Sequence, residues 1–298
     1  MKKRTVFWLV ALAVGAAVIP SRADDFAATT QPVQRLANGI VTPVNQIVTP
    51  AGKQVDLPHV RPNALALSPN GKMLVTAGLT HELIALDPAS GTILQRVALP
   101  ADKVPEEGPV AEAILNPDEK AQLSFTGLIF SPDGSRIYLS NVNGDIKVFA
   151  VGEAGKITAL GALALPSAKA PMREVEIPAG LAISRDGKKL YVAGNLSNRL
   201  LELDAVTGKV LRTWNTGVAP FGVALARNKV YVSNWGGRRP DPASVVGPAG
   251  LGTRVRVDAR SVASEGSISV VDLAQGDLSG TGHEIVIGPH ACALALSP

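Results

Sequence analysis

A short motif recurs along the chain and limits what it can fold into: an apolar run followed by a turn such as Ser-Pro-Asp-Gly. The apolar runs occupy residues 64–67, 127–130, 180–183, 222–225 and 293–296. Proline fixes φ at the first turn position, and an Asp-Gly or Asn-Gly pair accepts the positive φ that closes a hairpin. Each copy therefore predicts a strand, a tight turn and a second strand.

Each hairpin is followed by a third, more alternating strand, at residues 83–87, 146–149, 200–204 and 268–272. Turns that end in glycine, at residues 87–91 and 204–208, then open a fourth strand. A four-stranded unit of about 40 residues cannot bury both of its faces alone, so successive units stack around an axis. The sequence therefore predicts an all-β fold, a β-propeller of four-stranded antiparallel blades, with about four blades plus the start of a fifth.

The first residues predict an export signal that is not part of the fold. A basic segment (residues 2–4) precedes an apolar run (residues 7–19), and the small residues Ser21 and Ala23 suit a cleavage site. We predict a Sec-type signal peptide over residues 1–23, with an uncleaved membrane anchor as the alternative. The mature chain is expected to be periplasmic or secreted, without membrane contact after cleavage.

The rest of the chain divides by composition and by the spacing of the repeats. We expect an N-terminal extended segment at residues 24–58 and propeller blades at residues 59–298. A long insertion rich in Gly, Pro and Arg, residues 235–266, separates the second and third strands of the fourth unit. Long excursions of this kind usually carry a binding or docking role, or are disordered.

Charge and cysteine content exclude several classes of function. The chain has 29 Lys and Arg and 25 Asp and Glu, and four of the basic residues lie in residues 1–23, which leaves 25 of each sign. A net charge near zero provides no bulk field for nucleic acid or for an anionic membrane, so we expect neither as a partner. The single cysteine, Cys292, cannot form an intrachain disulfide, and the four histidines have no zinc-site spacing.

Two groups of residues resemble a known repeat family. Residues 231–234 and 137–141, together with the Ser-Pro-Asp-Gly turns, resemble the YVTN (YncE-like) family of bacterial propeller repeats. Residues 47–55, 233–240 and 252–258 further resemble the N-terminal propeller of exported proteins that join such a propeller to a C-terminal, alkaline phosphatase-like phosphoesterase domain. The resemblance covers the chain from about residue 35 to its end, and it implies a propeller of about seven blades.

The chain departs from that pattern because it has fewer blades and no phosphoesterase domain, so we interpret it as a fragment. We find no catalytic residues, no metal site and no cofactor site in it. The resemblance implies an exported, non-catalytic binding or scaffold module that docks to a phosphoesterase domain, with an anionic small molecule or phosphoester as ligand. Two alternatives stay open: a propeller enzyme of the lactonase type, and a standalone periplasmic or surface interaction protein.

Basic residues concentrate in the insertion, close to an aromatic side chain. The residues are Trp235, Arg238, Arg239, Arg254, Arg256 and Arg260. Guanidinium groups bind phosphate and carboxylate through paired hydrogen bonds, so one interpretation is a clamp for an anion. The other interpretation is a loop that docks by ion pairs onto a neighbouring blade or domain.

Asparagines recur at the end of the second strand of the unit. Asn141 and Asn234 fall at one repeat position, and Asn195 lies one residue later in its unit. Such residues either contact a ligand or cation at one end of the central channel or form turns with their own backbone. His290 and Cys292 lie together near the C-terminus, but two ligands on one segment do not make a metal site, and we interpret Cys292 as a core residue.

Overall fold

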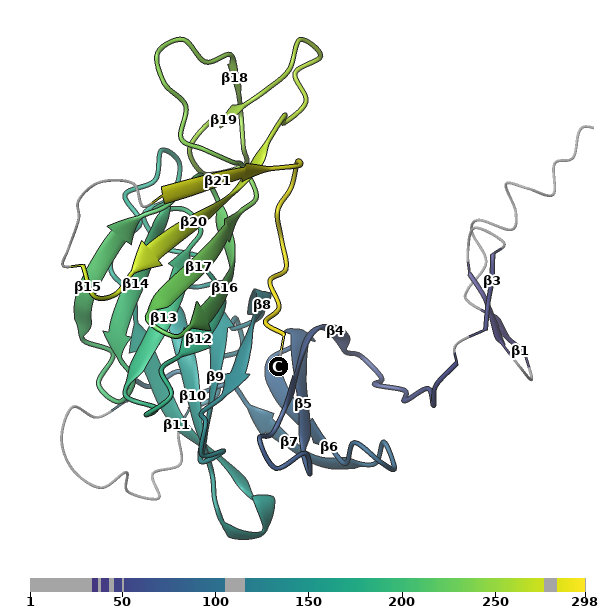
Figure 1. The fold of residues 1–298 in the computed structure, drawn as a ribbon. Coiled ribbons are helices and arrows are strands. Elements are labelled where there is room, and N and C mark those ends of the chain that lie inside the picture. The colour runs from purple at the N-terminus through teal and green to yellow at the C-terminus, as the bar shows by residue number, and fades with distance from the viewer. Residues whose placement is uncertain are drawn as a thin grey trace, which may run out of the picture. The chain divides into compact units, whose positions relative to one another are not determined.

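Among the residues that the structure describes, β-strands make up nearly all of the regular structure (Figure 1). The computed structural model describes residues 34–36, 39–42, 46–49, 51–104, 116–275 and 283–297, and the predicted signal peptide lies outside them. The described residues form no apolar helix of the length that a bilayer crossing requires.

The chain divides into two units, residues 1–54 and 55–298. In the smaller unit, the described residues form an antiparallel sheet of short strands in the order β1 (Gln34–Leu36), β2 (Gly39–Val41) and β3 (Ile47–Val48).

The larger unit contains four antiparallel sheets of four strands each, which we call blades 1 to 4. Blade 1 consists of β4 (Arg61–Leu67), β5 (Leu74–Leu79), β6 (Glu82–Leu86) and β7 (Ile93–Ala98). Blade 2 consists of β8 (Leu123–Phe130), β9 (Arg136–Asn141), β10 (Asp145–Val151) and β11 (Ile157–Ala164). Blade 3 consists of β12 (Pro178–Ile183), β13 (Lys189–Gly194), β14 (Arg199–Asp204) and β15 (Val210–Asn215). Blade 4 consists of β16 (Pro220–Ala226), β17 (Lys229–Asn234), β20 (Gly266–Asp272) and β21 (His283–Ile287).

Two smaller elements lie in the connections. A 3₁₀ turn, η1 (Glu153–Gly155), joins β10 to β11 in blade 2. The insertion between β17 and β20 forms a two-stranded antiparallel sheet of its own, β18 (Val246–Gly247) and β19 (Val255–Arg256). In Figure 1 this insertion projects beyond the strands of blade 4.

The first strands of the blades lie side by side and form the inner row of the unit. β4 packs beside β8, β8 beside β12, and β12 beside β16. The repeats aligned in the sequence are also equivalent in the sheets, because the last apolar residue before each turn pairs with the same position of the second strand. The pairs are Leu67 with Leu74, Phe130 with Ile137, Ile183 with Leu190 and Leu225 with Val230. The predicted β-propeller of four-stranded antiparallel blades is confirmed.

Three hydrophobic clusters fill the interfaces between successive blades. The second strand of blade 2 shows how one strand serves two of them. Ile137 and Leu139 join the cluster shared with blade 1, whereas Tyr138 joins the cluster shared with blade 3. Successive side chains of a strand point to opposite faces of its sheet, so a continuously apolar strand covers both neighbours. All three side chains are at most 1% exposed.

The repeated turn is fixed by a small hydrogen-bond network of its own side chains. In blade 2, the Ser131 hydroxyl accepts the backbone N–H of Arg136 at 2.9 Å and donates to the Asp133 carboxylate, which also accepts the N–H of Ser135 at 3.0 Å. The hydrogen bonds from Ser131 and Ser135 lower the pKa of Asp133 to about 2. Equivalent bonds are made by Ser68 and Asn70 in blade 1 and by Ser184 and Asp186 in blade 3.

Neighbouring inner strands approach so closely that they leave no room for a side chain at Gly127. A Cβ atom there would lie 2.2 Å from the carbonyl oxygen of Ala179 in blade 3 and 2.1 Å from the hydroxyl oxygen of Ser140. The Ser140 hydroxyl donates a hydrogen bond to that same carbonyl at 2.7 Å. Gly127 therefore permits the contact that joins blade 2 to blade 3.

The C-terminal residues repeat this contact beyond blade 4. The carbonyl oxygen of Cys292 lies against Gly222 of β16, 2.6 Å from where a Cβ would be, and it accepts a hydrogen bond from the Ser233 hydroxyl. This pair of contacts is the same as that between blades 2 and 3. Residues 291–297 thus occupy the place of the next inner strand, where the sequence predicts the start of a fifth blade.

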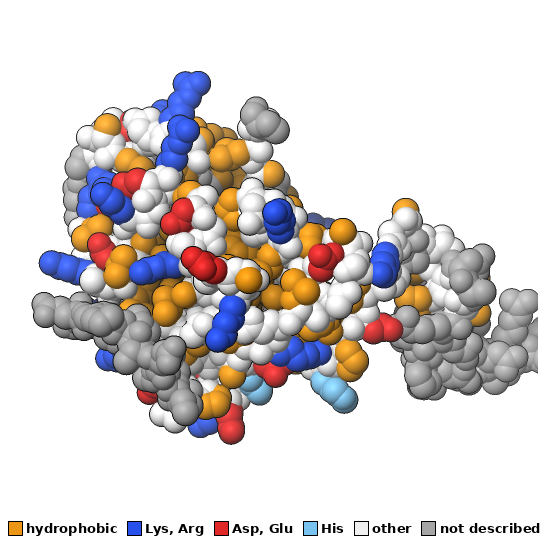
Figure 2. Space-filling model, turned by 90° about the horizontal axis from the view of Figure 1, so that it is seen from below, with side chains coloured by type: hydrophobic (Ala, Val, Ile, Leu, Met, Phe, Trp, Pro, Cys, Tyr) orange, Lys and Arg blue, Asp and Glu red, His pale blue; other side chains and the backbone are white. Residues whose placement is uncertain are grey.

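Blade 1 shows what an inner strand looks like when one face is uncovered. Leu65 and Leu67 of β4 are 65% and 55% exposed, whereas the equivalent Leu128 and Phe130 of β8 are 4% and 8% exposed. Figure 2 shows hydrophobic side chains gathered across the middle of one face of the molecule, between separate charged groups. Burial of these positions depends on a neighbouring blade rather than on the blade itself.

Replacement of Gly127 by alanine tests the close approach of the blades. We expect Gly127→Ala to lower the free energy of unfolding by about 1–3 kcal/mol, because the new methyl group must push apart two backbones. The matched control is Gly152→Ala, where the nearest atom to the new Cβ is 3.7 Å away and where φ is −81°. Urea unfolding followed by circular dichroism measures both, and equal stabilities of the two variants would contradict the packing described.

Candidate ligand-binding site

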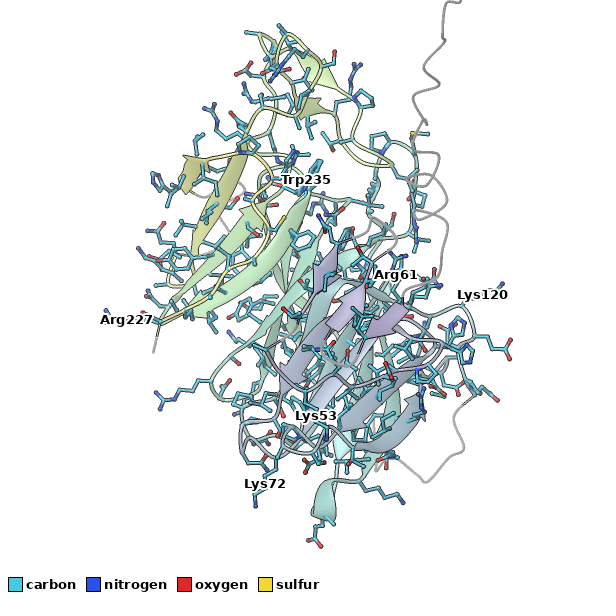
Figure 3. The ribbon with its side chains drawn as sticks, turned by 90° about the vertical axis from the view of Figure 1, so that its right-hand side faces the viewer. Lys53, Arg61, Lys72, Lys120, Arg227 and Trp235 are labelled. Carbon is cyan, nitrogen blue, oxygen red and sulfur yellow. The ribbon has the colours of Figure 1, made fainter. Side chains whose placement is uncertain are left out.

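A cavity of about 490 Å³ lies at the end of the blades where the inner strands begin. Its walls come from segments that are distant in the sequence, at the starts of β8 and β16, after β13 and β17, in the insertion and near the C-terminus. Trp235 lies between the strands of blade 4 and the lobe formed by β18 and β19 (Figure 3). The volume falls within the range of small-molecule sites in proteins.

An enlarged bulge in blade 2 brings Phe125 to the cavity. β8 advances from Leu123 to Leu128 while its partner β9 advances by two residues, whereas β12 covers the same step from Pro178 to Leu181. The inner strand of blade 2 thus holds two extra residues, and bulges of this kind re-aim side chains. The Phe125 ring meets the ring of Phe221 edge-on, with centroids 5.1 Å apart and planes at 62°.

Trp235 and His290 form a second aromatic pair on the cavity wall. Their ring centroids lie 4.2 Å apart, with the planes tilted by 33°. Trp235 follows β17 directly, and His290 precedes the C-terminal segment that packs on blade 4. The Cys292 thiol donates to the His290 carbonyl at 3.0 Å, so its hydrogen bond goes to the backbone of its own segment. The pair therefore connects the insertion end of blade 4 to the C-terminal segment.

Left-handed backbone conformations gather around this cavity. Nine non-glycine residues among those described have positive φ. Four of the nine line the cavity: Phe125 (50°), Ala219 (54°), Ser261 (63°) and His290 (61°). Such a conformation costs on the order of 1–3 kcal/mol for a residue with a Cβ, and it persists only where the surroundings impose it. Strain of this kind concentrates at binding and active sites, which favours this cavity as the functional one.

A larger cavity, of about 850 Å³, lies elsewhere, against the Ser-Pro-Asp-Gly turns of blades 1 and 2 and the η1 turn. It is lined by Ser68, Asn70, Asp133 and Ser135, whose side chains are used by the turn networks. The same turn recurs in blade 3, so the walls of this larger cavity are formed by the repeated turns themselves. The cavity at Trp235 is instead lined partly by residues of the insertion and by His290, which lie outside the repeated turns.

The arginines of the insertion mostly hold the insertion together. Arg238 makes a two-pronged ion pair with Glu265, at 3.0 and 2.9 Å, and this pairing lowers the pKa of Glu265. Arg256 bonds to Asp241 at 3.0 Å and lies 3.7 Å from Glu265. Each of these guanidinium groups therefore already faces a carboxylate of the same loop.

Arg239 is half-buried and bonds mainly to backbone. Its guanidinium donates to the carbonyl oxygens of Thr216 (2.8 Å) and Asn198 (2.6 Å) and to the side-chain oxygen of Asn215 (3.3 Å). Burial lowers its pKa. This single side chain thus ties the start of the insertion to the loops of blades 3 and 4.

The structure does not bring the predicted arginines together around one anion. Arg254 donates to the carbonyl of Val246 across the β18–β19 sheet at 3.0 Å, and Arg260 pairs with Asp258 two residues before it. Of the arginines and Trp235 that the sequence singled out, only Trp235 lines the cavity. Apart from Arg239, which bonds to Asn198 and Thr216, these arginines bond within the insertion, so both interpretations of them stay predictions.

The predicted asparagines lie inside the blades. Asn141 accepts the N–H of Gln122 at 3.0 Å and donates to Asp145 at 3.0 Å. Asn234 donates to the hydroxyls of Ser267 (3.0 Å) and Ser269 (2.8 Å). Both side chains are fully buried, so they join strands within a blade.

Asn195 differs, because it lines the cavity and donates its side-chain N–H to the carbonyl of Pro220 at 3.0 Å. That bond leaves its carbonyl oxygen as the acceptor that a ligand could use.

Blade 4 also buries an acidic group next to the insertion. Glu284 accepts a hydrogen bond from Ser269 at 3.0 Å, and burial raises the pKa of Glu284. Its Oε2 atom and the Oδ1 atom of Asn234 are buried without a hydrogen-bond partner among the described residues. Across the described part of the chain, no group of three or more His, Cys, Asp or Glu side chains is placed to hold a metal ion.

The fold defines the class of the protein: a β-propeller. Among solved structures, the chain is similar to hydrazine synthase of Kuenenia stuttgartiensis, with a TM-score of 0.50 and 18% identity over 80% of this chain and 52% of that one. It is also similar to U3-55K (TM-score 0.46, 13% identity, 75% of this chain and 64% of that one). A further similar structure is the Cps50 (Swd1) β-propeller domain of Myceliophteria thermophila (0.46, 11%, 83% and 78%).

At these identities the likeness concerns the fold alone. The chain spans about half the length of the hydrazine synthase chain that it matches. No protein-family model matches this chain, and no curated protein matches its sequence.

Sequence reasoning identified Trp235 but missed the aromatic residues that face it. Phe125 carries a signal that could have been used: residues 123–127 do not align with the other units without a two-residue gap. Phe221 and His290 carry no local signal, because their role arises only when blade 4 and the C-terminal segment meet the insertion.

Arginine substitutions test which of these contacts hold the insertion. We expect Arg239→Ala to lower the free energy of unfolding by about 1–3 kcal/mol, because it leaves the buried carbonyl group of Thr216 without its donor. The matched control is Arg260→Ala, whose side chain is 82% exposed, and which should change stability by less than about 0.5 kcal/mol. Urea unfolding with timed tryptic digestion of the insertion measures both effects, and two equally stable variants would argue against this role of Arg239.

Proposed function

We propose that the chain is a non-catalytic binding module that holds its ligand in the cavity at Trp235. The observation that carries the proposal is the coincidence of two aromatic pairs and four left-handed residues around one cavity of about 490 Å³. The blades supply a rigid frame for these side chains, because blades 2 and 3 are packed on both faces and blade 4 packs between blade 3 and the C-terminal segment. A site on such a frame needs little reorganisation when a ligand binds, which favours affinity.

The proposal extends to the setting in which the module works. Its export is supported by the signal-like pattern of residues 1–23. A role beside a phosphoesterase domain, to which the module would dock, is supported by the resemblance of residues 47–55, 233–240 and 252–258 to propellers of that kind. The arginines of the insertion would then stabilise the lobe that such a domain meets.

A ligand screen tests the binding function directly. Compounds from a defined small-molecule library are added to the protein, and the melting temperature is followed by scanning fluorimetry. A compound that binds only the folded state at about 100 times its Kd adds about 2.7 kcal/mol of stability. We expect hits that raise the melting temperature of the wild type by several degrees and lose this effect in Phe221→Ala.

The matched control for that screen is Val206→Ala, which truncates an apolar side chain that is 49% exposed in the turn between β14 and β15. It should respond to every hit as the wild type does. A complete absence of hits, or hits that stabilise Phe221→Ala equally, would reject the cavity as the binding place.

Export is tested by the fate of the first residues in a Gram-negative host. We expect the full chain to be recovered from the periplasm with Asp24 as its first residue, because Ser21 and Ala23 suit cleavage after Ala23. Cell fractionation and N-terminal sequencing measure this, with Ala23→Arg as the variant that blocks cleavage. Recovery of the wild type in the membrane fraction with residues 1–23 intact would instead support the uncleaved anchor.

A further inference from the structure

We propose that the ligand of the cavity is an uncharged, flat aromatic ring that carries few hydrogen-bonding groups. This inference rests on the proposed binding function and adds the chemical class of the ligand. It is argued from what faces the cavity, since the side chains that line a site decide what it can accept without leaving a polar or charged group unpaired.

Charge is the first property that the cavity selects against. None of the described residues that line it is Asp, Glu, Lys or Arg, and His290 is the one titratable side chain on its wall. The arginines nearest in sequence to Trp235 are already engaged, Arg238 by Glu265 and Arg239 by backbone carbonyls. An anion would therefore lose its hydration without gaining a counter-charge, and burial of an unpaired charge is costly.

The scarcity of polar groups narrows the class further. Asn195, Ser261, His290 and the indole N–H of Trp235 are the side-chain groups among the described lining residues that can hydrogen-bond. One donor group of Asn195 is already bonded to Pro220. A sugar or polyol would bring several hydroxyl groups into a wall of this kind, and most of them would find no partner. The cavity suits a ligand with one or two polar atoms.

The aromatic walls supply the positive part of the selection. Phe125 and Phe221 already pack edge-to-face at 5.1 Å, and Trp235 presents an indole beside them. Aromatic pairs at such distances gain stability beyond the area that they bury. A planar ring that enters between these side chains and the aliphatic residues Val255 and Val257 would repeat this packing on both of its faces.

Two dyes that share one ring system test the charge preference. N-phenyl-1-naphthylamine is uncharged, and 8-anilino-1-naphthalenesulfonate adds a sulfonate to the same pair of rings. We expect the uncharged dye to bind the wild type at least about tenfold more tightly, since even a small unpaired-charge penalty changes affinity by this factor. Fluorescence titration gives both dissociation constants.

A charge introduced at the rim provides the matching variant. Val262 lines the cavity and is 49% exposed, so Val262→Lys can be made without burying a charge in the core. Val262→Lys should weaken the binding of the uncharged dye and strengthen the binding of the sulfonate dye. The sulfonate dye should then have the lower dissociation constant. Val206→Ala and Leu65→Ala are controls for dye bound to exposed apolar surface elsewhere, and they should change neither titration.

The outcomes separate this inference from the proposed function. If Phe221→Ala, Phe221→Leu and Val262→Lys all leave both titrations unchanged, the cavity binds neither dye and the proposed function fails with the inference. If Phe221→Ala and Phe221→Leu weaken the binding of both dyes, but the sulfonate dye binds the wild type more tightly than the uncharged dye, the cavity binds ligands and the uncharged class is wrong. Phe221→Leu keeps most of the buried area in case Phe221→Ala fails to fold.

Displacement distinguishes the two sources of an aromatic ring. Free indole and N-acetyl-tryptophanamide are each titrated against bound N-phenyl-1-naphthylamine. Displacement by both compounds supports an aromatic side chain of a partner protein, because the amide compound carries the flanking peptide groups. Displacement by indole alone supports a small free aromatic molecule. If neither compound displaces the dye up to its solubility limit, the aromatic class is overturned.

Discussion

Each blade of this protein is a single sheet, and a single sheet has two apolar faces to cover. Three consecutive residues of the second strand of blade 2 show how neighbouring blades cover both faces. Ile137 and Leu139 face blade 1, and Tyr138 faces blade 3. Complete burial of one such side chain contributes about 1.5–3 kcal/mol. No blade can gain this alone, so its stability is shared with its neighbours, as in other stacked repeats.

This dependence on neighbours explains the contrast between the two ends of the row of inner strands. At one end, Leu65 and Leu67 of blade 1 lie open although their counterparts in blade 2 are buried. At the other end, residues 291–297 pack on blade 4 through the contact at Gly222 and Ser233. His290 precedes that segment and its ring packs against Trp235, so the packing of the row also builds one wall of the cavity.

The parts of the fold that could be predicted from sequence are those encoded by neighbouring residues. The turn of Ser131 and Asp133 closes on its own side chains within five residues, and its recurrence locates the blades. The cavity could not be predicted in this way, because Phe221, Trp235 and His290 are brought together only by the packing of blades and insertion. The number of arginines in the insertion does not show which group each guanidinium binds, and most of them bond within the loop.

Arginine-rich loops are open to two interpretations, because a guanidinium bonds equally well to an external anion, to a carboxylate of its own chain or to backbone carbonyls. In this protein Arg238 bonds to Glu265, and Arg239 bonds to the carbonyls of Thr216 and Asn198. The bonds of Arg239 fix the insertion over the blades. The charge of the loop is thereby used to position apolar residues such as Val255 at the cavity. Which ligand such a site accepts is then set by the few side chains that face inward rather than by the composition of the loop that carries them.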